Sequence, residues 1–151
     1  MSISHFDYPP LSPALAVRDA AKAIEFYKAA FGAVERFRLV DPESGKIGHA
    51  EITINGCLVM LADEYPAYNK APQTLGGTPV KLSLMVPNVD SFVEQAKRAG
   101  ATVMMQPQDQ VYGHRCGSVQ DPFGHVWMIQ CEIEKVSPAE MQKRWDAMVK
   151  K

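Results

Sequence analysis

The stretch GHRCGSVQDPFGHVW, from Gly113 to Trp127, carries the pattern that decides the fold. Its first part, 114–119, is a β-like run, and a second run follows over 126–131. Between them lies the turn sequence DPFG at 121–124. Two apolar, β-prone runs separated by such a turn predict an antiparallel hairpin.

A second hairpin is predicted earlier in the chain. The runs 47–54 and 58–62 flank Asn55-Gly56, and an Asn-Gly pair in this context is the strongest short hairpin signal. Short matches link the two halves of the chain: a Gly-His pair at an offset of 65 residues and an apolar run at 68 in the hairpins, and the strand residues 15–17 with 84–86 at 69. The chain therefore contains an internal repeat.

Each hairpin is preceded by the same order of strand, helix and strand. The first copy comprises 12–17, 20–31 and 34–40, and the second comprises 81–86, 90–99 and a strand that begins at 102–106. The expected helix caps are Asp19 and Asp90 at the N-terminal ends and Gly32 and Gly100 at the C-terminal ends.

The sequence thus predicts an α+β protein of two tandem βαβββ modules, at about 11–62 and 80–132. The Pro- and Gly-rich segment 63–79 joins them, either as a tether or as a lid over a cavity. A capping box at Ser137 and Glu140 predicts a C-terminal helix over 137–150. Its apolar stripe of Met141, Trp145 and Met148 is expected to pack on the body or on another chain.

Composition restricts the class of protein. The chain has 151 residues, 46% of them hydrophobic, and a net charge of −1, which disfavours disorder and nucleic-acid binding. No apolar run is long enough for a membrane span, and the start of the chain lacks a signal-peptide pattern. The three cysteines have no Cys-x-x-Cys spacing and are expected to be reduced thiols. We therefore expect a cytoplasmic globular protein.

Three stretches, FYKAAFGA at 26–33, GHAEITING at 48–56 and the hairpin at 113–127, resemble the vicinal-oxygen-chelate superfamily. This superfamily includes glyoxalase I, bleomycin-resistance proteins and ring-cleaving dioxygenases, and the resemblance is to its PhnB-like branch. It implies that the paired modules form a U-shaped half-barrel with a ligand on the concave face. It also implies a homodimer.

The resemblance raises the question of a metal. Metal-dependent members take His, Glu or Gln ligands from the first, fourth, fifth and eighth strands. The matching positions here are Ser12, Met60, Lys81 and Met128, and none suits a catalytic divalent ion. We therefore expect no metal and no other cofactor, and we expect these four residues to converge inside the concavity. An atypical set of His49, Glu51 and His114 remains the alternative.

Period-two alternation predicts which side chains line the cavity. The expected lining is largely apolar and rich in Met, as in many small-molecule sites. The predicted ligand-binding residues are Ser12, His49, Glu51, Thr53, Met60, Lys81, Ser83, Met85, Arg115, Met128 and Gln130.

Two classes of function follow from these residues. The first is a metal-free protein that encloses a small planar or amphipathic ligand, with Lys81 as a buried anchor for negative groups. The second is an enzyme, either a metal-dependent lyase, isomerase or dioxygenase, or a metal-free one that uses Glu51 or Lys81 for proton transfer.

Overall fold

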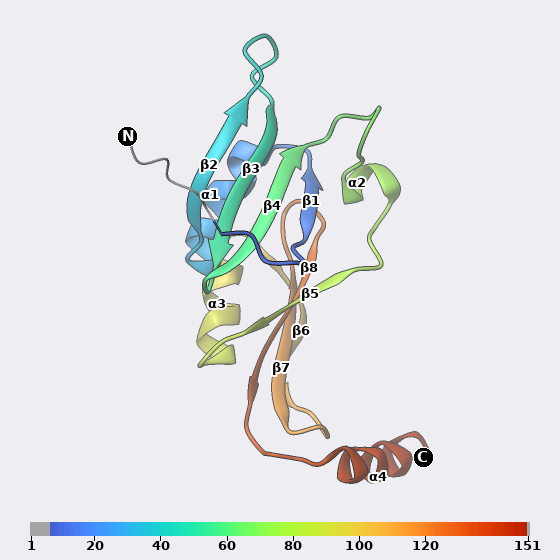
Figure 1. Cartoon of the computed structure of the whole chain (residues 1–151). Coiled ribbons are helices and arrows are strands. Elements are labelled where there is room, and N and C mark those ends of the chain that lie inside the picture. Colours follow the sequence, from blue (N-terminus) through green and yellow to red (C-terminus); the bar gives the residue numbers. More distant parts are fainter. Residues whose placement is uncertain (1–6, 151) are drawn as a thin grey trace. The chain divides into compact units, whose positions relative to one another are not determined.

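The computed structural model describes residues 7–150, which divide into two units at the boundary between Gly76 and Gly77. The first unit contains β1, α1, β2, β3, β4 and α2 in that order (Figure 1). Their bounds are Ala14–Val17, Ala20–Phe31, Val34–Val40, Ile47–Ile54, Cys57–Asp63 and Pro72–Leu75. The sheet order is β1-β4-β3-β2, with β1 parallel to β4 and the other pairs antiparallel.

The second unit repeats this arrangement. It contains β5, α3, β6, β7, β8 and α4, with bounds Lys81–Met85, Val89–Ala99, Thr102–Asp109, His114–Gln120, Val126–Glu132 and Pro138–Val149. Its sheet order is β5-β8-β7-β6, and β5 runs parallel to β8. Two βαβββ modules and a C-terminal helix are therefore confirmed.

Helix α1 begins and ends where the sequence predicts. The Asp19 side chain accepts a hydrogen bond from the Lys22 N–H at 3.1 Å, and the Gly32 N–H bonds the Lys28 carbonyl at 3.1 Å. Gly32 has φ of 67°, a left-handed conformation in which a side chain would be strained.

The core of the first unit lies between α1 and the sheet. Ile24 and Tyr27 of α1 are fully buried, as are Ile52 of β3 and Leu61 of β4. Burial of each such side chain contributes about 1.5–3 kcal/mol relative to exposure. Because α1 covers one face of the sheet, every second residue of β3 and β4 points to the opposite face.

Three details differ from the sequence-based expectations. Strand β1 begins at Ala14, so Ser12 lies outside it; Pro13 precedes the strand and offers no N–H for a sheet. Asn88, and not Asp90, caps α3, since the Asn88 side chain accepts from the Ser91 N–H. The joining segment contains the one-turn helix α2.

Helix α4 is capped by Ser137, whose hydroxyl accepts from the Glu140 N–H at 3.2 Å, as predicted. Arg144 attaches the helix to the second unit through two hydrogen bonds to the Glu134 carboxylate and one to the Val111 carbonyl. No residue of α4 is buried. Among residues 7–150, no helix is long and apolar enough to cross a membrane.

Candidate functional site

The face of the first sheet that α1 leaves uncovered is called the open face below. Its side chains follow the strand register: Glu51 pairs with Met60 and Phe37, and Met60 pairs with Ala14. The open face has small or flexible apolar side chains on β1 and β4 and polar ones on β3, as the alternation predicts.

A buried carboxylate lies at the centre of this face. Glu51 is 2% exposed, and its Oε2 accepts from the Tyr8 hydroxyl at 3.1 Å and contacts His49 Nε2 at 2.9 Å. Arg36 Nε lies 3.8 Å from Oε1, an ion-pair distance. A buried carboxylate requires such partners, because an uncompensated charge in the interior is costly.

The contacts of Glu51 determine which of its partners donate hydrogen bonds and which atoms remain acceptors. Partial desolvation of the hydroxyl, followed by the hydrogen bond with Glu51, raises the pKa of Tyr8, so the hydroxyl remains a donor at neutral pH. An ionised carboxylate only accepts hydrogen bonds, so His49 must donate through Nε2. In the neutral imidazole, Nδ1 is then the acceptor nitrogen.

Two hollows open on either side of this cluster. The larger hollow, of about 510 Å³, is lined by a mostly apolar set that includes Tyr8, Leu11, Pro13, Arg36, Thr53 and Leu58. The smaller hollow, of about 180 Å³, is lined by Ala14, Ala16, His49, Met60, Ala62 and Asn69, among others. Tyr8 lines the larger hollow and His49 lines the smaller one. Both side chains contact the same oxygen of Glu51, Oε2.

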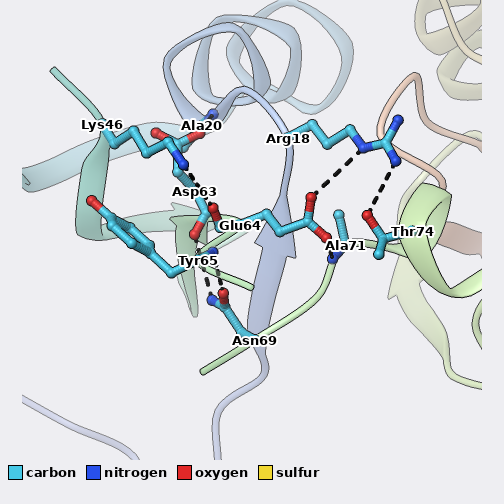
Figure 2. Close-up of polar contacts among 9 residues, drawn as sticks. All are labelled: Arg18, Ala20, Lys46, Asp63, Glu64, Tyr65, Asn69, Ala71 and Thr74. Carbon is cyan, nitrogen blue, oxygen red and sulfur yellow. Dashed lines mark hydrogen bonds and ion pairs between the residues drawn. The ribbon is translucent and has the colours of Figure 1, made fainter. Parts of the chain in front are cut away.

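The segment after β4 belongs to the first unit, and its Asn69 lines the smaller hollow. Figure 2 shows the polar contacts of this segment. Asp63 is buried and accepts from the N–H groups of Ala20 at 2.8 Å and Ile47 at 2.6 Å. Glu64 accepts from the Ala71 N–H at 2.9 Å and pairs with Arg18 at 3.7 Å. These contacts attach the segment at both of its ends.

We expect Glu64→Ala to loosen this segment. A hydrogen bond from the Thr74 hydroxyl and one from the Ala71 N–H lower the pKa of Glu64. A carboxylate whose pKa is lowered in the folded state stabilises that state above its unfolded pKa, and this stabilisation is lost as the pH falls through the folded pKa. Hydrogen exchange of the 65–76 amides should therefore be several-fold faster in the variant at neutral pH, and the difference should shrink in acid.

The exposed pair of Glu25 and Lys28 on α1 supplies the control for this measurement. Glu25→Ala should leave exchange of the 65–76 amides unchanged. Equal exchange in the Glu64→Ala variant and the unmodified protein would contradict the role of Glu64.

The uncovered face of the second sheet carries a different polar chain. His114 Nδ1 bonds Gln130 Oε1 at 2.8 Å, and Gln130 Nε2 donates to the Ser83 hydroxyl. Met85 pairs with Gln130, and Met128 pairs with Ser83, so these residues share one face as predicted. Their role in ligand binding remains a prediction.

Two predicted residues of the second unit lie in different surroundings from those expected. Arg115 points to the α3 side, where it bonds Asp90 at 2.7 and 2.8 Å and Asp109 at 2.9 Å, because it alternates with His114 and Cys116 on β7. Lys81 is exposed and not buried. It lies close enough to Cys116 to lower the pKa of that thiol, although burial raises it more.

The four positions that the resemblance equates with metal ligands do not fit a catalytic divalent ion. They offer a hydroxyl, two thioethers and an ammonium. Of the atypical set, His49 and Glu51 are in contact, whereas His114 belongs to the second unit and bonds Gln130. Within residues 7–150, no group of three His, Cys, Asp or Glu side chains is placed to hold a metal.

Sequence reasoning missed Tyr8 and Arg36. Tyr8 precedes β1 in a Pro-rich stretch that shows no periodicity. Arg36 lies at an irregularity between Glu35 and Phe37, where the register of β2 against β3 shifts. Alternation fails at such a bulge, because one extra residue is inserted without a partner.

Comparisons with known proteins agree with this fold. The model of the glyoxalase/bleomycin resistance protein/dioxygenase superfamily matches residues 2–129. The chain belongs to this family.

Among individual relatives, an uncharacterized protein of Mycobacterium bovis is 46% identical over 138 residues, covering 89% of this chain and 90% of that protein. TioX from Micromonospora is 28% identical, with a TM-score of 0.64, and the match covers 81% of this chain and 97% of that one. The PhnB protein from Bacillus cereus is 16% identical, with a TM-score of 0.62 over 82% of this chain and 99% of that one, and so shares the fold.

Proposed function

We propose that this protein binds a small planar or amphipathic molecule on the open face of its first sheet, without a metal. The observation that carries the proposal is the larger hollow beside Glu51. Its volume of about 510 Å³ lies within the range of small-molecule sites. A mostly apolar lining with a few fixed polar groups is also typical of such sites.

The polar groups at this hollow are held in place before any ligand arrives. Arg36 lies over the Tyr8 ring at 5.2 Å, and Tyr8 bonds Glu51. Side chains positioned in this way lose little conformational freedom on binding, which favours affinity. For the second unit by itself, ligand contacts are proposed for Lys81, Ser83, Met85, Met128 and Gln130, with exposed Lys81 available for a negative group.

The test uses the fluorescent anionic probe 1-anilinonaphthalene-8-sulfonate, which is flat and amphipathic. Thr53→Trp places a large ring in the larger hollow and should weaken probe binding about ten-fold, since a filled hollow excludes the ligand. Thr102→Trp, on the exposed start of β6, is the matched control and should bind like the unmodified protein. Equal binding by both variants would overturn the proposal.

The alternative is a metal-dependent lyase, isomerase or dioxygenase that uses His49 and Glu51. The contact of His49 with Glu51 is the observation that favours it. Elemental analysis of protein purified without a chelator separates the two. If the purified protein contains stoichiometric metal that a chelator removes, the metal-free proposal is wrong and the metal-dependent enzyme takes its place.

The protein is further proposed to be a cytoplasmic homodimer. Trp145 is 53% exposed and Met148 45% exposed, on a helix without buried residues. Exposed apolar stripes of this kind mark interaction surfaces. The three cysteines are free thiols, which supports a reducing compartment.

Sedimentation at micromolar concentration should therefore show a dimer, and Trp145→Glu should shift it toward monomer. Lys143→Glu, on the same helix, serves as the control for charge and should sediment as a dimer. If the unmodified protein sediments as a monomer, the proposal of a homodimer is wrong.

A further inference from the structure

The smaller hollow holds a histidine nitrogen without a partner. His49 uses Nε2 for Glu51, and within residues 7–150 its Nδ1 has no hydrogen-bond partner. The side chain is 36% exposed and lines the smaller hollow. In the neutral tautomer that donates through Nε2, Nδ1 is therefore an acceptor available to a donor from outside the chain.

The other polar side chain of this hollow is already engaged. Asn69 Oδ1 accepts from the Tyr65 N–H at 2.6 Å, and Asn69 Nδ2 donates to the Asp63 carbonyl at 3.5 Å (Figure 2). The acceptor of His49 is thus the polar group of the hollow that a ligand can use most directly.

The apolar lining indicates the shape of the ligand. Ala14, Ala16 and Ala62 have small side chains that leave room above β1 and β4, and Met60 lies among them. Thioether sulfur makes favourable contacts with aromatic rings. A hollow of about 180 Å³ suits one ring better than a larger body.

We infer that the smaller hollow binds a phenol, whose ring packs on Met60 and the alanines and whose hydroxyl donates to His49 Nδ1. This inference rests on the proposed function, because it names the class of ligand that the open face takes. Glu51 acts as a positioning residue: its hydrogen bond to Nε2 holds the ring and fixes Nδ1 as the acceptor.

The repeat offers an internal contrast. His114 matches His49 in the second unit, but its Nδ1 is occupied by Gln130 Oε1 at 2.8 Å. His114 therefore offers no acceptor at Nδ1, and its Nδ1 signal should not respond to a phenol.

The test compares p-cresol with 4-methylanisole, in which a methyl group replaces the hydroxyl hydrogen. The unmodified protein should bind p-cresol about ten-fold more tightly, the effect of one hydrogen bond. In ¹⁵N spectra the His49 Nδ1 signal should move on addition of p-cresol, whereas that of His114 should not. His49→Phe should abolish the preference, and His114→Phe should retain it.

The outcomes separate the inference from the proposed function. Equal binding of p-cresol and 4-methylanisole, or a stationary His49 signal, would overturn the inference and leave a ligand in the larger hollow unaffected. Binding of neither compound would also overturn it. Failure of the proposed function would appear instead as equal binding of the sulfonate probe by the Thr53→Trp and Thr102→Trp variants.

Discussion

Asp121→Ala is expected to lower the free energy of unfolding of the second unit by about 4 kcal/mol. Asp121 is 3% exposed and accepts from the Phe123 N–H at 2.9 Å, the His125 N–H at 3.0 Å and Trp127 Nε1 at 2.9 Å. Removing the carboxylate leaves three donors in or near the core, and each buried unsatisfied donor costs about 1–3 kcal/mol.

Urea denaturation followed by tryptophan fluorescence measures this loss, because Trp127 and Trp145 both lie in the second unit. Asp109→Ala is the matched control, since Asp109 also lies in the second unit but its carboxylate is exposed and bonds Arg115 at the surface, where water replaces it. The control should lose much less stability. If the two variants lost similar amounts of unfolding free energy, the hydrogen bonds of Asp121 in the turn would not stabilise the hairpin.

Glu51→Ala is expected to cost the first unit about 3–5 kcal/mol, the usual effect of removing one member of a buried ion pair. Arg36 would lose the carboxylate that lies 3.8 Å from its Nε, and the side chain of Arg36 is only 11% exposed. Tyr8 and His49 would lose their shared acceptor. Glu51→Gln, which keeps the shape and one acceptor oxygen, should cost less.

Calorimetric unfolding of the two variants provides the measurement. Glu25→Ala is the control, because Glu25 lies exposed on α1 and pairs with Lys28. If Glu51→Ala were as stable as the control variant, the cluster around Glu51 would not be part of the folded framework. A second readout is the pKa of Tyr8, which should fall toward its ordinary value in Glu51→Gln, because the charged acceptor is gone.

Much of the fold could be predicted from local signals. Asp19 and Gly32 delimit α1, and Ser137 caps α4, because caps are interactions within a few residues of the chain. The hairpin at Asn55-Gly56 follows from the same kind of local chemistry, with Asn55 at φ of 49° and Gly56 at 78°.

Local reasoning failed where a neighbour in space decides the outcome. Asp90 is a good cap by type, yet Asn88 takes that role and Asp90 pairs with Arg115 of β7. Arg115 was expected to line the ligand site, but its place in the strand alternation and its two aspartate partners hold it on the α3 side.

Residue spacing along the chain was sufficient to predict the two repeated modules, the ends of α1 and α4, and the set of β3 side chains that share a face with Glu51. Each of these depends on spacing along a few residues, and period-two alternation is a property of any extended strand. The contact of Tyr8 and His49 with the same oxygen of Glu51 becomes visible only in the folded chain. Tyr8 is 43 residues away from Glu51 in the chain, and no local pattern records such a contact. The physical reason is that the buried carboxylate must be compensated, and the packed chain supplies whichever donors it brings within reach.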